Sequence, residues 1–138
     1  YNRLRDLNGS LTCTLSIQRL YLHNNELENI TMDINSLGNL KYLDLKDNKN
    51  LTLELLNFPY LESLIIRNTS SKLIEKINFR SVLNLTKLDI SNNKINFDLF
   101  KKIPFKDLKN LNDIHLELTD LKYSNKILDI FNSLRFID

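Results

Sequence analysis

The chain has 138 residues, a formal net charge of +2, and a composition in which 42% of the residues are hydrophobic. This length corresponds to one domain with a continuous core rather than to two domains. The mild charge argues against a nucleic-acid partner, and no apolar run approaches the length of a membrane span, so we expect membrane contact only through a missing part of a parent protein.

The first segment, residues 1–14, precedes the regular pattern of the chain and contains three leucines. We interpret it as an N-terminal cap or a degenerate repeat, which leaves residues 15–138 as the main body of the domain. Cys13 is the only cysteine, so no disulfide forms within the chain. It is either a small buried apolar residue or one half of a bridge whose partner lies outside this chain.

From residue 15 onward, one phrase recurs six times: apolar-x-x-apolar-x-apolar, followed three residues later by Asn or Thr in the first five copies. The positions between the apolar residues are almost all polar, and such alternation over a short segment is typical of a strand with one buried face. The central apolar residues of the six phrases are Leu20, Leu43, Leu64, Leu88, Ile114 and Leu134. The pattern predicts strands near 19–23, 42–46, 63–67, 87–91, 113–117 and 133–137.

The phrases follow one another at steps of 23, 21, 24, 26 and 20 residues. With this period and spacing, the chain resembles the leucine-rich-repeat (LRR) family from Leu15 to its C-terminus. The resemblance implies an α/β leucine-rich-repeat solenoid: a curved right-handed stack of about six repeats, with a parallel β-sheet on the concave face and an irregular or short helical convex side.

The resemblance also implies a role for the Asn that follows each strand, whose amide in this family bonds the backbone of the turn and of the neighbouring repeat. Thr69 and Thr119 replace two of these Asn residues. A hydroxyl makes fewer such bonds, so we expect a looser ladder of bonds at the third and fifth repeats.

Two later segments have helical features. A short helix over 97–103, capped by Asp98, would explain the longest step between phrases. Residues 124–134 form either a capping helix with Ser124 as N-cap or the approach to the sixth strand. We favour the strand, because Leu128 and Phe131 keep the phase of the repeated phrase.

The sequence lacks the residues that common catalytic and cofactor sites require. Two glycines exclude a glycine-rich phosphate loop, and one cysteine with two histidines excludes ordinary zinc sites. His115 is expected beside Asp89, Asp113 and Glu117, but no Ser or Cys nucleophile accompanies it. We therefore interpret this cluster as a solvated charged patch and expect no enzyme activity, no cofactor and no metal.

The polar positions of the predicted strands would form the exposed side of the sheet, where we expect a protein ligand to bind. The first three strands carry a net charge of +2 there together with tyrosines, and the next two carry −2 around a histidine. The candidate binding residues are Arg19, Tyr21, His23, Tyr42, Asp44, Lys46, Ile65, Arg67, Asp89, Asp113, His115 and Glu117. The alternative is that the ligand uses a flank or a missing repeat.

Five Asn-x-Ser/Thr sequons lie in predicted turns, connecting segments or the N-terminal stretch, outside the exposed strand positions. They are Asn8, Asn29, Asn50, Asn68 and Asn84. Their placement would suit a glycosylated ectodomain with a free concave face. The alternative is chance in a chain with 20 Asn residues.

The resemblance implies a non-catalytic protein-recognition domain, which we favour as part of an extracellular or cell-surface protein of the receptor-like or immune type. One alternative is a cytoplasmic adaptor or a scaffold similar to phosphatase regulators. A second is a surface or secreted microbial factor that binds a host protein. The fold does not decide among these settings.

Overall fold

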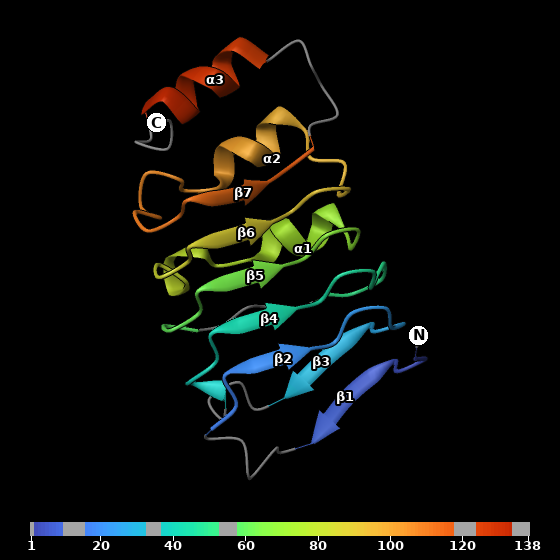
Figure 1. Cartoon of the computed structure of the whole chain (residues 1–138). Helices are drawn as coiled ribbons and strands as arrows, with labels where there is room; N and C mark the ends of the chain where they lie inside the picture. Colours follow the sequence, from blue (N-terminus) through green and yellow to red (C-terminus); the bar gives the residue numbers. More distant parts are fainter. Residues whose placement is uncertain (1, 10–15, 33–36, 53–57, 118–123, 134–138) are drawn as a thin grey trace.

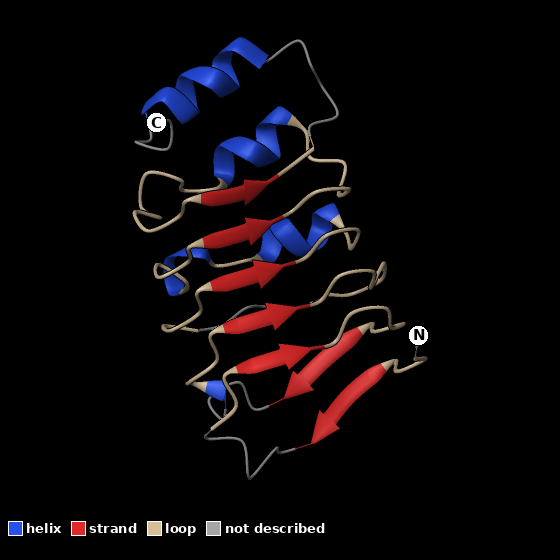
Figure 2. Cartoon of the chain, in the orientation of Figure 1, coloured by secondary structure: helices blue, strands red, loops and turns tan. Residues whose placement is uncertain are grey.

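The computed structural model describes residues 2–9, 16–32, 37–52, 58–117 and 124–133. It shows an α/β chain with parallel sheets and a few short helices (Figures 1 and 2). The larger sheet is open and has five strands, which add to one another in chain order. They are β2 (Arg19–Tyr21), β4 (Tyr42–Asp44), β5 (Ser63–Ile65), β6 (Lys87–Asp89) and β7 (Asp113–His115).

The register of this sheet is the one that the repeated phrase predicts. The central apolar residues are aligned across the strands, in the order Leu20, Leu43, Leu64, Leu88 and Ile114. Each strand has three residues and ends earlier than we expected, although backbone bonding continues beyond it. For example, the Leu45 amide donates to the Ile65 carbonyl oxygen at 2.8 Å.

Three residues after the end of each of four successive strands, the backbone enters a left-handed turn at an equivalent position. Asn24, Asp47, Asn68 and Asn92 have φ values of 55°, 60°, 51° and 57°. Asn and Asp tolerate this conformation because their short polar side chains can bond locally. Lys94 also has a positive φ, of 51°, without that advantage.

Buried Asn side chains connect consecutive units just after these turns. The Asn48 amide nitrogen donates to the carbonyl oxygens of Leu22 and Leu45, at 3.0 and 2.8 Å. Asn93 does the same with Ile66 and Ile90, at 2.7 and 3.0 Å. The expected bonding role of the Asn is therefore confirmed at both positions.

Thr69 occupies the equivalent position between Asn48 and Asn93. Its hydroxyl donates to the Ile66 carbonyl oxygen of its own unit at 2.8 Å, and its backbone amide donates to the Asn93 side-chain oxygen at 2.7 Å. Among the described residues, the Thr69 side chain bonds only its own unit and the following one and does not reach the preceding unit, as the smaller hydrogen-bonding capacity of a hydroxyl leads one to expect. Thr119 lies outside the described residues.

The core lies on the inner side of the five-stranded sheet, where Leu43, Leu64 and Leu88 are buried. Helices on that side contribute further buried residues, Leu73 from α1 (Ser71–Lys76) and Phe100 from α2 (Phe97–Lys102). A 3-10 helix, η2 (Phe79–Ser81), lies between β5 and β6.

The helix α2 matches the short helix expected over 97–103, but its N-cap is Asn96 and not Asp98. The Asn96 side-chain oxygen accepts from the Leu99 amide at 2.9 Å. Asp98 is the second residue of the helix, two positions past the N-cap, and its carboxylate pairs instead with Lys101 at 3.0 Å. The other α-helix before it, α1, has Ser70 as its N-cap.

A second parallel sheet, which the sequence did not lead us to expect, joins the N-terminal segment to the first unit. It consists of β1 (Asp6–Gly9) and β3 (Asn29–Met32), with Asp6 opposite Asn29. Paired residues of β1 and β3 are 23 positions apart in the sequence, which equals the first step between phrases. Residues 2–9 therefore run beside residues 25–32 in the same way that one unit runs beside the next.

For residues 124–133, the favoured interpretation as the approach to a sixth strand is wrong. Residues Ser124–Ser133 form the helix α3, in which Ile127 is buried and Phe131 packs against the core. Leu128, which a strand would have turned inward, is 53% exposed. The spacing of Ile127 and Phe131 places both on one face of a helix, and this burial outweighs the phase of the phrase. Residues 134–137 lie outside the described residues.

Replacing Asn93 with Ala should lower the free energy of unfolding by ~2–4 kcal/mol, because buried carbonyl and amide groups of two units would lose their partner. Exposed Asn50→Ala is the matched control, with an expected change within ~0.5 kcal/mol. Urea unfolding followed by circular dichroism measures both. Equal, small effects would contradict a structural role for Asn93.

Candidate functional site

The side chains that alternate with the buried leucines form one surface, which we call the exposed face. Strand pairing aligns them in two rows, and the side chains just after the strands form a third. The first row is Arg19, Tyr42, Ser63, Lys87 and Asp113; the second is Tyr21, Asp44, Ile65, Asp89 and His115. The third is His23, Lys46, Arg67, Ser91 and Glu117. All twelve predicted binding residues thus belong to these rows.

An aromatic cluster lies at the β2 end of the exposed face. The rings of Tyr21 and Tyr42 have centroids 4.9 Å apart, and Tyr21 is 53% exposed. His23 meets Tyr21 edge-on at 6.4 Å. Partial burial, followed by the neighbouring Asp44 carboxylate, raises the pKa of Tyr42 above its ordinary value of 10.0.

The prediction for Asp44 is wrong. We expected this residue to be exposed, but only 8% of its surface is accessible. His23 Nδ1 lies 2.9 Å from Asp44 Oδ2, and the Lys46 amide donates to Asp44 Oδ1 at 3.0 Å. Its carboxylate is thus held by the neighbouring imidazole and by its own turn. This carboxylate organises the exposed face and offers little of its surface to a ligand.

Two exposed arginines belong to the same rows as the aromatic cluster. Arg19 and Arg67 are exposed, and within the described part of the chain neither forms an ion pair. Lys46, which lies between them in the sequence, has its Nζ 3.7 Å from Asp47 Oδ2. The guanidinium groups are therefore the free cations of this end, and each can bind a carboxylate through two parallel hydrogen bonds.

At the β7 end, Asp113 is the centre of a polar cluster. Lys87 donates to Asp113 Oδ2, and His115 Nε2 lies 2.9 Å from Asp113 Oδ1. The Lys87 bond is the main cause that lowers the pKa of Asp113, and the same bond raises the pKa of Lys87. Of the predicted cluster, Asp113 and His115 are thus brought together.

The other two carboxylates of this end are not part of that cluster. Asp89 accepts from the Ser91 hydroxyl at 2.6 Å and from its amide at 3.1 Å. Glu117 is exposed beyond β7. Because Lys87 neutralises Asp113, the acidic character predicted for this end depends on Asp89 and Glu117.

Ser63 was not a predicted site residue. It lies between Tyr42 and Lys87 in the first row and is buried, and its hydroxyl is the one buried side-chain polar atom without a partner among the described residues. The sequence signal that could have indicated this burial is a short side chain, Ser63, between the long side chains of Tyr42 and Lys87 in the same row.

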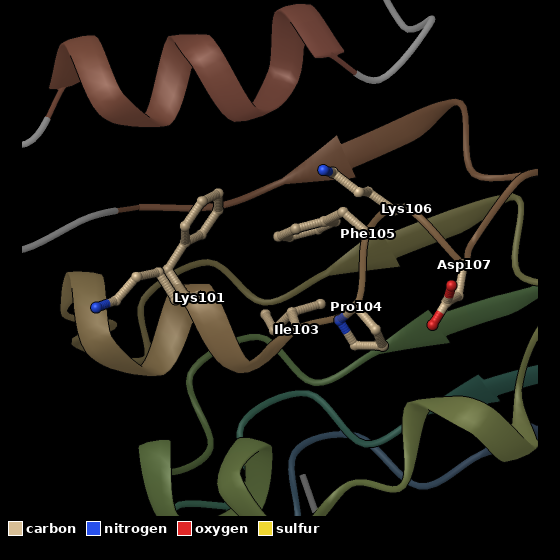
Figure 3. A pocket seen from close by; sticks show the side chains of 7 residues that line it. Lys101, Ile103, Pro104, Phe105, Lys106 and Asp107 are labelled. Carbon is tan, nitrogen blue, oxygen red and sulfur yellow. The ribbon is translucent and has the colours of Figure 1, made fainter.

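An apolar hollow lies away from the exposed face, after α2 (Figure 3). It has a volume of about 370 Å³ and is lined by Ile103, Pro104, Phe105 and neighbouring residues. Ile103 and Phe105 are buried core residues, so the hollow is an indentation of the core surface. Lys101 at its rim pairs with Asp98, as expected of a solvated basic loop.

A polar hollow of about 630 Å³ lies at the turns that follow the strands, where Asn24, Asp47 and Asn68 contribute to its lining. Within the described residues, no three His, Cys, Asp or Glu side chains gather as a metal site requires. No helix of the described part is long and apolar enough to cross a bilayer.

Two of the sequon asparagines lie in strands, and the other three lie in turns. Asn8 and Asn29 lie in β1 and β3, outside the five-stranded sheet. Asn50 is exposed, whereas the Asn68 amide donates to Asp47 at 2.6 Å in a partly buried site. The Asn84 amide donates to the Pro59 carbonyl oxygen.

Comparison with protein-family models, with curated proteins and with solved structures finds no match for this chain.

The Asp113 carboxyl should titrate below its ordinary value of 3.8, and Lys87→Met should raise its pKa by removing the main donor. His115→Gln should raise it less, because His115 is a smaller cause. The sign follows from linkage: a lowered folded-state pKa stabilises the fold above 3.8, and this stabilisation is lost as the pH falls through the folded value. Carboxyl ¹³C NMR titration measures all three; an unshifted Asp113 in the wild type would contradict the pairing.

Proposed function

We propose that the chain is a leucine-rich-repeat solenoid. The parallel sheet grows by one strand per phrase, in one register, and buried Asn side chains connect units at the equivalent positions of Asn48 and Asn93. A strand of three residues cannot bury an apolar face alone, so each unit depends on its neighbours. These features support the proposal beyond the spacing of the leucines.

We infer that the function is non-catalytic recognition of a protein partner through the exposed face. The observation that carries this proposal is the packed pair of Tyr21 and Tyr42, with the exposed Arg19 and Arg67 on the same face. Tyrosine and arginine are enriched among the residues that dominate binding energy in interfaces. The tyrosine pair is packed before any partner arrives, which lowers the entropy cost of binding.

The charge of the exposed face supports a defined orientation of the partner. Free cations lie near β2 and β5, whereas Asp89 and Glu117 lie toward β7. Opposite charges at the two ends steer association and fix the register of a ligand. A partner with an acidic and a basic region at matching separation would suit this arrangement.

We propose an extracellular or cell-surface setting for this activity, as part of a receptor-like or immune-type glycoprotein. The support is the exposed Asn50 sequon, which lies off the exposed face. A cytoplasmic adaptor or phosphatase-regulator-like scaffold is the alternative, as is a microbial factor that binds a host protein. All three would use the same face.

Tyr21→Ala, Tyr42→Ala and Arg67→Ala should each weaken partner binding by ~1–3 kcal/mol while leaving the fold intact. The ligands are proteins selected on the immobilised chain from a displayed library of folded domains, and calorimetry measures their affinities. Tyr60 is the matched control, because it is 57% exposed and lies outside the three rows. Unchanged affinity in the three variants, or an equal loss in Tyr60→Ala, would refute the exposed face as the binding surface.

Expression in a eukaryotic secretory pathway should place a sugar on Asn50, whose side chain is exposed. Asn68 should carry less, because its amide is partly buried against Asp47. Mass spectrometry before and after enzymatic deglycosylation measures the occupancy of each sequon. A folded, soluble and unmodified product would favour the cytoplasmic alternative.

A further inference from the structure

The turns that precede the strands of the larger sheet lie along one flank of the molecule, at the tails of the strand arrows (Figure 1). The turn over residues 58–61 is closed by a bond from the amide of its last residue to the carbonyl oxygen of its first, at 3.1 Å. The turn over residues 82–85 of the next unit is closed in the same way, at 3.2 Å. Because the two turns share this construction, Tyr60 of the first corresponds to Asn84 of the second.

This flank carries two of the five large hydrophobic side chains that are exposed in the described part of the chain. Tyr60 is 57% exposed and Leu83 is 45% exposed. Pro59, which corresponds to Leu83 in the turn before, is also exposed. We call these three residues the flank patch. The equivalent turn positions of the units on either side are Gly38 and Asn39, and Lys109 and Asn110, so the patch is confined to two units.

The size of the flank patch limits what can cover it. A stable protein interface buries roughly 800 Å² of each partner, which three side chains do not supply. A small group that a covalent bond holds beside the patch needs no such area, because its effective concentration there is high. The patch therefore fits a covalently attached group better than a protein partner.

The side chain of Asn84 is placed to hold such a group. Asn84 is exposed, and its Nδ2 donates to the carbonyl oxygen of Pro59 in the preceding unit. This bond holds the amide nitrogen beside the flank patch, next to the residue before Tyr60. A side-chain amide has two hydrogens, so the bond to Pro59 leaves the second position of the nitrogen for a substituent.

We propose that Asn84 carries an N-linked glycan whose first sugar packs on Tyr60 and Leu83 and covers the flank patch. Asn84 and Thr86 form the sequon, and the C–H face of a sugar suits the electron-rich face of an aromatic ring. This inference rests on the proposed extracellular setting, because the secretory pathway supplies the sugar donor, a lipid diphosphate oligosaccharide. In the transfer, Asn84 Nδ2 loses a proton and bonds to C1 of the sugar, and the C1–O bond breaks as the lipid diphosphate leaves with the electron pair.

Asn50 provides a matched control, because it is an exposed sequon asparagine in a different setting. Its neighbours in the chain are the exposed Lys49 and the buried Leu51, and its turn contains no aromatic residue. A sugar on Asn50 should therefore be solvated and should leave Tyr60 accessible.

Nitration by tetranitromethane, followed by mass spectrometry, measures whether the sugar covers Tyr60. In the chain from eukaryotic secretory cells, nitration of Tyr60 should be at least ~5-fold slower than in Asn84→Gln, as a packed aromatic contact predicts. Asn50→Gln should leave this protection intact. Tyr21, which is 53% exposed on the exposed face, is the internal reference and should react equally in all three proteins.

Enzymatic trimming separates packing of the first sugar from shading by the outer sugars. An endoglycosidase that leaves one sugar on Asn84 should preserve the protection of Tyr60, and an amidase that removes the whole glycan should abolish it. Loss of protection at the first of these steps would overturn the packing of the first sugar.

A thermal cycle tests the same contact through stability. Glycosylation at Asn84 should raise the Tm by about 2 °C relative to Asn84→Gln, and the difference should vanish when both chains carry Tyr60→Ala. An equal increment in the two backgrounds would overturn a contact with Tyr60.

The occupancy of the sequons distinguishes failure of this inference from failure of the proposed setting. A sugar on Asn50 with none on Asn84 would overturn the inference and leave the extracellular setting in place. A chain unmodified at every sequon would overturn both. Partner binding is measured separately, because the flank patch lies outside the three rows of the exposed face.

Discussion

The structure depends on the need to satisfy the backbone of very short strands. A strand of three residues leaves most of its amide and carbonyl groups to its neighbours, and the turn after it adds more polar groups close to the core. Asn48 and Asn93 meet this need with one side chain each, which joins the carbonyl oxygens of two consecutive units. The leucine ladder supplies the driving force, but these amides make its burial compatible with a turning backbone.

The same repetition creates the exposed face. Once the register is fixed by Leu43, Leu64 and Leu88, every alternate side chain must lie in a row with its counterparts on adjacent strands. The tyrosine pair and the Lys87–Asp113 pair are both contacts across such rows. The surface proposed for recognition is thus a direct product of the packing that holds the core together.

The sequence predicted the register because a strand alternates with a period of two and its buried positions are nearly all Leu or Ile. It failed where one spacing suits two structures: Phe131 fits a sixth strand by phase and a helix by its distance from Ile127, and only tertiary burial selects the helix. The burial of Asp44 was missed because it depends on His23 of the adjacent unit. The pairing of β1 with β3 involves segments without the repeated phrase, so no pattern indicated it.

The two ends of the larger sheet are built differently, and this has a consequence for how the molecule opens. Each strand pairs only with its immediate neighbours in chain order, so the loss of one end need not disturb the strands beyond it. Fraying should begin at β2, where Ile17 and Leu20 are half-buried, and should proceed inward toward the fully buried middle of the sheet. Amide hydrogen exchange would then show a gradient along the sheet, with β5 and β6 protected longest and β2 exchanging by local opening.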